Sequence, residues 1–265
     1  RPVIVGAGPG GLFAALTLAE AGWAPIVLER GNPVETRAKD VSKLYSKGLL
    51  NEDSNVCYGE GGAGTFSDGK LYTRVSDARA LQFMESLVRF GAKPDILINN
   101  RPHLGTDKLI ALLKQVRARL LELGCEIRFG TTLEDFRIDN GQLTGLKLVG
   151  GETIDTTHAI AATGHSDHSM WKKLHAHKVE LESRPFAVGF RIEHPQDLID
   201  EMRYGKAHVN HPNLPAADYK LAHTDKSPGG RGVYSFCMCP GGVVVATPTL
   251  EGELCINGMS HAARS

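Results

Sequence analysis

The chain has 265 residues, 42% of them apolar and 23% charged, which supports a packed core and excludes wholesale disorder. Thirty basic residues balance thirty acidic ones, so no strong field favours nucleic acid or an anionic membrane as a partner. Five scattered cysteines indicate reduced thiols in a cytoplasmic protein rather than a disulfide framework. No run approaches the roughly 18 apolar residues of a membrane span. The expected partner is therefore a small-molecule substrate, with the oligomeric state left open.

The chain opens with a strand, a glycine-rich turn, a helix and a second strand. Val3–Val5 is a β-branched run that predicts a buried parallel strand. The turn over 6–11 leads into an apolar helix over 12–21 that is stopped by Gly22. Residues 26–28 predict the next strand of the sheet. This order is typical of a βαβ unit in an α/β fold.

The turn carries the pattern G-x-G-x-x-G. Gly6 permits the tight turn, Gly8 lets the backbone approach a pyrophosphate, and Gly11 lets the helix lie close to the strand. Glu29 stands 23 residues after Gly6, near the roughly 20-residue spacing of an acid that binds ribose hydroxyls. The pattern predicts dinucleotide binding at the helix N-terminus, and the alternative is a βαβ unit without a ligand.

The middle of the first half continues the same fold. Helical spacing of apolar residues predicts a helix that begins near Thr106 and ends at Gly124. Strands are expected over 126–129, 142–149 and 152–157, the last two joined by a glycine turn. These strands predict one more sheet strand and a β-meander.

Two segments favour FAD over NAD. The run from Val3 to Arg30 resembles the opening of two-dinucleotide-binding-domain flavoproteins, which often end this unit with Glu-Arg. The apolar strand 159–162 leads into Ala162-Thr163-Gly164 and resembles the second flavoprotein signature, where the chain passes close to the nucleotide. No second G-x-G-x-x-G follows an apolar strand and opens a helix, so a separate NAD domain is not expected in this chain.

A dense glycine stretch occupies the middle of the chain. Gly64 to Lys70 fits the phosphate-loop spacing G-x-x-x-x-G-K, but Leu71 stands where that motif needs Ser or Thr for magnesium. No strong apolar strand precedes it. A nucleotide triphosphatase is therefore the minor alternative.

Four long motifs carry a more specific resemblance, namely 59–70, 101–107, 186–196 and 234–242. With them the chain resembles a family of largely uncharacterised bacterial FAD-dependent dehydrogenases over essentially its whole length. Members of that family carry a further N-terminal domain and a C-terminal flavin-closing segment, so the chain is similar to an internal fragment of it.

The resemblance implies an FAD-dependent oxidoreductase that transfers hydride or electrons through the flavin, with NAD(P)H as a candidate reductant and an unassigned substrate. The alternatives are a non-catalytic FAD-binding or regulatory protein and an RNA-modifying flavoenzyme. The chain departs from the family at Cys57, where Gln is usual, and at Asp167-His168-Ser169, where Ala-Arg-Asp is usual. The second departure removes a positive charge after the Ala-Thr-Gly turn.

The predicted cofactor-binding residues come from the glycine turn, the acid and its neighbours, the glycine loop and the Ala-Thr-Gly strand. They are Gly6, Gly8, Pro9, Gly10, Gly11, Glu29, Arg30, Arg37, Gly61, Gly62, Gly64, Thr65, Lys70, Ala162, Thr163 and Gly164. For Arg37, a phosphate contact and a surface charge on the helix running to Tyr45 are both open. For Lys70, a positive charge beside the flavin ring competes with a solvated lysine.

The second half contains further polar candidates. Alternating apolar residues over 186–192 predict a strand with one buried face. Arg191 and His194 are candidate substrate contacts, against an ordinary ion pair of Arg191 with Glu193. Four histidines between 165 and 177 admit a zinc interpretation, although their pattern matches no usual structural site and solvated histidines explain them better.

Cys237 and Cys239 are either a redox pair or two packed thiols on one strand face. Together with Lys70 they are the weak catalytic candidates, and no acid or base is assigned. The fold predicted from these elements is α/β. A Rossmann-type FAD-binding domain with a parallel sheet and a β-meander covers 1–182, and part of an inserted, mostly β substrate or cap domain covers 183–265.

Overall fold

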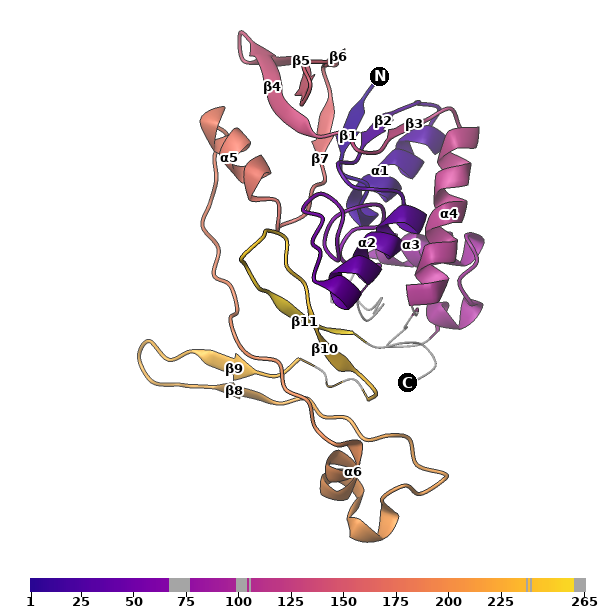
Figure 1. The fold of residues 1–265 in the computed structure, drawn as a ribbon, viewed down its shortest axis with the longest axis vertical. Helices are drawn as coiled ribbons and strands as arrows, with labels where there is room; N and C mark the ends of the chain where they lie inside the picture. The colour runs from indigo at the N-terminus through magenta and orange to yellow at the C-terminus, as the bar shows by residue number, and fades with distance from the viewer. Residues whose placement is uncertain (67–76, 99–103, 105, 237, 239, 260–265) are drawn as a thin grey trace.

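The computed structural model describes residues 1–66, 77–98, 104, 106–236, 238 and 240–259, with only the backbone described for Thr106 and Asp107 (Figure 1). The candidates Lys70, Cys237 and Cys239 lie outside the described residues.

A parallel sheet forms the centre of the first half. Its strands are β1 (Val3–Val5), β2 (Ile26–Leu28), β3 (Glu126–Arg128) and β7 (Ala159–Ala161), in the order β3-β2-β1-β7. All three neighbouring pairs run parallel. The two inner strands, β2 and β1, are buried at all three positions, as expected for strands covered on both faces.

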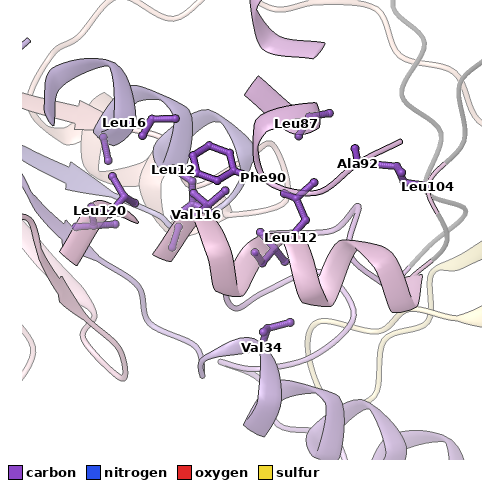
Figure 2. Close-up of a cluster of buried hydrophobic side chains, with 14 of the residues drawn as sticks. Leu12, Leu16, Val34, Leu87, Phe90, Ala92, Leu104, Leu112, Val116 and Leu120 are labelled. Carbon is purple, nitrogen blue, oxygen red and sulfur yellow. The ribbon is translucent and has the colours of Figure 1, made fainter. Parts of the chain in front are cut away.

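Two helices, α1 (Pro9–Glu20) and α4 (Thr106–Glu122), cover one face of this sheet. Helix α2 (Val34–Lys47) packs against α4, and α3 (Ala78–Arg89) packs against a 3-10 turn at Pro94–Leu97. Figure 2 shows Leu12 and Leu16 of α1 gathered with Val116 and Leu120 of α4 in one buried cluster. Ile4 and Val27 of the sheet belong to the same cluster, so the helices and the sheet share one core.

A β-meander covers the other face. It consists of β4 (Leu133–Asp139), β5 (Gln142–Leu148) and β6 (Thr153–Asp155), which pair antiparallel in that order. Val3, Val5, Ile26 and Leu28 pack there against Leu133, Leu146, Leu148 and Met170, the last from helix α5 (His168–Ala176). Alternate residues of each sheet strand thus serve the two cores.

The predicted α/β class, with a parallel sheet and a meander, is confirmed. The sequence did not predict β4, because its run Glu134–Asp139 is rich in charged residues and lacks a regular apolar alternation. In the structure the last three residues of this strand are exposed. No helix within the described ranges is long and apolar enough to cross a membrane.

The second half is built from smaller elements. They are α6 (Gln196–Tyr204), a 3-10 turn at Lys206–His208, the hairpin β8 (Ala222–Thr224) with β9 (Gly232–Tyr234), and the hairpin β10 (Val243–Ala246) with β11 (Ile256–Met259). The strand predicted over 186–192 is wrong: this segment is extended without a partner strand among the described residues. Alternation of side chains predicts two different faces, but a strand also needs a neighbour to pair with.

Candidate functional site

A cavity of about 350 Å³ lies at the carboxyl ends of the parallel strands. This is the edge where ligands bind in open α/β sheets, and the volume lies at the lower end of the range for small-molecule sites. The lining residues are Val5, Gly6, Gly8, Pro9, Gly10, Leu28, Glu29, Arg30, Cys57, Tyr58, Gly59, Gly62, Ala63, Thr131, Thr132, Leu133, Ala162, Thr163, Gly164, His165, Ser166, Asp167, Ser169, Met170 and Lys173.

The glycines of the turn fall into two kinds. At Gly6, where φ is +107°, a Cβ would collide with the carbonyl oxygen of Ala162, and at Gly11 it would collide with the carbonyl oxygen of Gly6. At Gly8, by contrast, the nearest atom to an added Cβ is the Cα of Gly62 at 3.8 Å, and at Gly10 nothing lies within 4 Å. The fold itself therefore requires glycine at the first pair but leaves open space in front of the second.

The N-terminus of α1 faces this open space without a cap. Gly8 is the N-cap and has no side chain to accept a hydrogen bond, and the first turn contains no acidic residue. The first helical hydrogen bond runs from the N–H of Leu12 to the carbonyl oxygen of Gly8 at 2.9 Å. The N–H groups of Gly10 and Gly11 therefore have no intrahelical acceptor, and the positive end of the helix dipole is uncompensated. Such a helix start binds phosphate readily.

Glu29 ends β2 inside the cavity. Its side chain is only 6% exposed, and its two oxygens accept hydrogen bonds from the N–H of Ala7 at 2.8 Å and the N–H of Gly31 at 2.9 Å. These two bonds fix the carboxylate between the glycine turn and the chain after β2. Each carboxylate oxygen has a further lone pair that can accept a hydroxyl from a ligand.

Arg30 and Tyr58 form one wall of the cavity. The guanidinium of Arg30 lies over the Tyr58 ring at 3.8 Å from its centre, and its nitrogens lie 3.9 Å from carboxylate oxygens of Asp53 and Asp167. The Tyr58 hydroxyl donates to the carbonyl oxygen of Ser166 at 2.7 Å. Burial raises the pKa of Tyr58, although Arg30 lowers it, so the hydroxyl stays protonated near neutral pH.

Arg37 differs from both sequence interpretations. Its side chain is fully buried, and its guanidinium donates to five backbone carbonyls, those of Asn55, Val56, Gly59, Glu60 and Gly62, at 2.6–3.3 Å. Burial lowers the pKa of Arg37 to about 10, while Glu29, Cys57 and Glu60 raise it, so the side chain remains charged near neutral pH. Its five N–H donors are all used by the protein. Arg37 is therefore neither at the surface nor free to contact a phosphate.

The glycine loop next to the cavity is shaped by this arginine and by the turn. At Gly59 and Gly62 φ is positive. An added Cβ at Gly59 would lie 2.5 Å from Arg37 Cδ, and one at Gly62 would lie 3.2 Å from Gly8 Cα. The N–H of Gly61 donates to the carbonyl oxygen of Ala7 at 2.8 Å. The loop thus lies directly against the glycine turn, and both line the same cavity.

Glu60 links the glycine loop to α2 and α4 through buried hydrogen bonds. Its carboxylate is fully buried, and Oε2 accepts from the N–H of Val34 at 2.8 Å and from Arg117 at 2.9 Å. Oε1 has no hydrogen-bond partner in the described part of the chain. Burial raises the pKa of Glu60 above its usual value, against the lowering effects of Val34 and Arg117.

Ten of the predicted cofactor residues line the cavity, namely Gly6, Gly8, Pro9, Gly10, Glu29, Arg30, Gly62, Ala162, Thr163 and Gly164. Four others lie in or beside the same loops without lining it, namely Gly11, Gly61, Gly64 and Thr65. Thr65 is buried, and its hydroxyl occupies the space of a Cβ at Gly61.

Sequence reasoning missed part of the lining. Thr131, Thr132 and Leu133 follow β3, and the stretch 165–173 follows β7. Their position after neighbouring parallel strands was the available signal, because the carboxyl ends of such strands meet at one edge. Cys57 also lines the cavity. Burial raises the pKa of its thiol, although the nearby Arg37 lowers it, and the raised pKa keeps Cys57 from being a reactive thiolate.

Two candidate substrate contacts lie outside the cavity lining. Arg191 donates to Asn257 Oδ1 at 2.6 Å, and the ring nitrogen Nε2 of His194 lies 2.9 Å from the hydroxyl of Tyr219. The expected ion pair between Arg191 and Glu193 is wrong. Glu193 instead accepts a hydrogen bond from the N–H of Val244 at 2.6 Å.

The histidine stretch is dispersed. His165 lines the cavity, whereas His177 pairs with Asp135 at 2.7 Å on the meander. The described residues hold no group of three or more metal-binding side chains.

The strand order and the cavity at the strand ends define a Rossmann-type α/β protein. Residues 185–265 match the sequence family described as "FAD-dependent protein, C-terminal domain-like". The whole chain is 47% identical to an uncharacterized protein of Clostridium beijerinckii over 264 residues. The match covers 49% of that protein, so the chain spans about half the length of this curated relative.

Solved structures show weaker similarity. The crystal structure of Thermovibrio ammonificans THI4 is 19% identical with a TM-score of 0.43, covering 66% of this chain and 61% of that one. The 3-ketosteroid-Δ4-(5α)-dehydrogenase of Rhodococcus jostii is 15% identical with a TM-score of 0.38, covering 62% and 45%. Because both scores are below 0.5, the fold is assigned from the strand order of the chain itself.

Proposed function

We propose that the cavity binds the adenosine diphosphate half of FAD. The observation that carries this proposal is the contrast within the glycine turn: the fold leaves open space at Gly8 and Gly10, directly before an uncapped helix N-terminus. A Cβ at Gly8 would meet no protein atom closer than 3.8 Å, so packing does not explain the glycine. Close approach of a pyrophosphate does. The family described as FAD-dependent, which matches residues 185–265, supports FAD among the dinucleotides.

Each part of the nucleotide has residues that suit it. The N–H groups of Gly10 and Gly11 would hold the pyrophosphate, and Glu29 would accept the hydroxyls of the adenosine ribose. Leu133 and Met170 are buried side chains of the lining and provide an apolar surface for the base. Arg30, over the Tyr58 ring, would limit access of water at the adjacent wall.

With FAD bound, we infer that the protein is an oxidoreductase, since the flavin supplies hydride and electron transfer. In this proposal residues 1–182 form the FAD-binding domain, and 183–265 form part of a substrate or cap domain. The protein positions the flavin and excludes water, and NAD(P)H is the proposed reductant.

Anaerobic reduction tests the enzymatic part. The complete gene product, loaded with FAD, is mixed with NADH or NADPH, and the absorbance of the oxidised flavin near 450 nm is followed. A rapid loss of absorbance with one of the two nucleotides supports an oxidoreductase. Stable FAD binding without reduction by either nucleotide, or by a panel of dehydrogenase substrates, would favour a non-catalytic FAD-binding protein instead.

A further inference from the structure

Between α5 and α6 the chain runs extended (Figure 1), and the large apolar side chains of this stretch are exposed. The exposed fractions are 87% for Phe186, 89% for Val188, 101% for Phe190 and 70% for Ile192. A soluble surface exposes isolated apolar side chains, but four alternating large ones form a contiguous apolar strip. We call residues 185–193 the apolar segment.

The polar side chains of the apolar segment contact the β10–β11 hairpin. Arg191 donates to Asn257 Oδ1 on β11 at 2.6 Å, and Glu193, the last residue of the segment, accepts from the N–H of Val244 on β10 at 2.6 Å. Alternate residues of an extended chain point in opposite directions. The polar side chains therefore hold the segment against the β10–β11 hairpin, and the apolar side chains point away from it.

The backbone of the apolar segment is also unpaired. No backbone hydrogen bond links 185–193 to another described residue. An extended chain with unpaired N–H and C=O groups is a template for pairing with another strand. The apolar side chains of the segment, and a backbone that pairs with no described strand, thus favour the same kind of partner, an apolar β-strand.

The surrounding region lacks a core of its own. Both hydrophobic clusters of the described residues draw on positions up to Leu174. In the second half, large apolar side chains remain exposed on the hairpins or next to them, including Val233 at 68%, Phe236 at 64% and Leu254 at 73%. Burial of apolar area is the main stabilising contribution to a fold. The region therefore needs apolar cover from other polypeptide.

We propose that the apolar segment is a docking strand for another part of the same polypeptide, which pairs with it and covers Phe186, Val188, Phe190 and Ile192. The relative from Clostridium beijerinckii supports this occupant, because the matched region is only 49% of that protein. A partner on the same polypeptide is present at high effective concentration and needs no separate association. This inference does not rest on FAD binding.

Hydrogen exchange of the complete gene product tests the pairing. The proposal predicts that amides of 185–193 exchange at least about tenfold more slowly than in an unstructured peptide of the same sequence, because paired amides exchange only on opening. The protection should be independent of protein concentration. Exchange at the peptide rate would overturn the proposal, and protection that disappears on dilution would assign the segment to contact between two copies instead.

A pair of substitutions tests the burial. Phe190→Ser should lower the midpoint of thermal unfolding of the complete gene product by several degrees, because it removes a covered ring. Ile98→Ser is the matched control, since Ile98 is 86% exposed in the first half, and it should leave the midpoint nearly unchanged. Equal, negligible effects of both changes would show that Phe190 is an ordinary surface residue and would overturn the proposal. Because FAD content is measured in the same samples, a failure here is distinguishable from a failure of FAD binding.

Discussion

The side chain of Arg37 fills the space that a Cβ at Gly59 would occupy. An added Cβ would lie 2.5 Å from Arg37 Cδ, and φ at Gly59 is +111°. The guanidinium also donates to the Gly59 carbonyl oxygen at 3.3 Å. The loop that lines the cavity thus has its conformation set by a buried cation beneath it.

Replacement of Arg37 should unfold this loop. Arg37→Leu is expected to lower the free energy of unfolding by at least about 3 kcal/mol, since several buried carbonyls lose their donor at about 1–3 kcal/mol each. Arg184→Leu is the control, because the Arg184 side chain is 77% exposed and forms a surface ion pair with Glu182. Urea unfolding measures both. A loss at Arg37 no larger than at Arg184 would contradict the role assigned to this buried arginine.

Arg37→Lys separates charge from geometry. A lysine keeps the positive charge but offers three donors instead of five in a planar fork. We expect it to recover only part of the lost stability. Full recovery would mean that the charge alone, rather than the five carbonyl contacts, holds the loop.

Arg37 also shows the limit of sequence reasoning. The strand Val3–Val5, the turn and helix α1 are encoded by neighbours in the chain, and local patterns predicted them. The partners of Arg37 lie 18–25 positions away, in a loop with no regular periodicity. Its burial follows from packing of α2 against that loop, and no local pattern carries this information.

Two other differences between the sequence predictions and the structure also depend on contacts between distant parts of the chain. The segment 186–192 alternates as a strand does, but the described chain supplies no neighbour for it. Thr131 and Thr132 line the cavity because β3 lies beside β2, which is a fact of sheet order rather than of spacing. The glycine turn and Glu29 could be predicted because their spacing is itself the signal.

Glu60 should make stability depend on pH. Its folded pKa is raised by burial, so between its unfolded value near 4.5 and the higher folded value the folded state binds more protons. Stability from this group is therefore present below the unfolded pKa and is lost as pH rises through the folded pKa. Glu60→Gln should remove this component, so the difference in unfolding free energy between the two proteins changes across that range. A difference that stays constant with pH would contradict the raised pKa.

Glu29 should contribute to both the turn and the nucleotide. Glu29→Gln leaves one of two N–H groups, that of Ala7 or of Gly31, without its acceptor, at a cost of about 1–3 kcal/mol in stability. It should also weaken FAD by about 1.5–3 kcal/mol through lost ribose hydrogen bonds. Isothermal titration of the folded variant with FAD and with FMN measures this. FMN lacks the adenosine ribose, so equal weakening of both ligands would contradict the assigned contact.

The most direct test of FAD binding at the glycine turn is the dissociation constant of FAD for Gly8→Ala in the complete gene product, measured by quenching of flavin fluorescence. The new Cβ meets no protein atom within 3.8 Å, so urea unfolding should be nearly unchanged, as it should for the control Gly232→Ala, which lies on β9 with open space around it. We predict that FAD binds at least about tenfold more weakly to Gly8→Ala, a loss of about 1.4 kcal/mol, and unchanged to Gly232→Ala. Equal FAD affinity of the wild-type protein and Gly8→Ala would contradict the placement of the pyrophosphate at this turn.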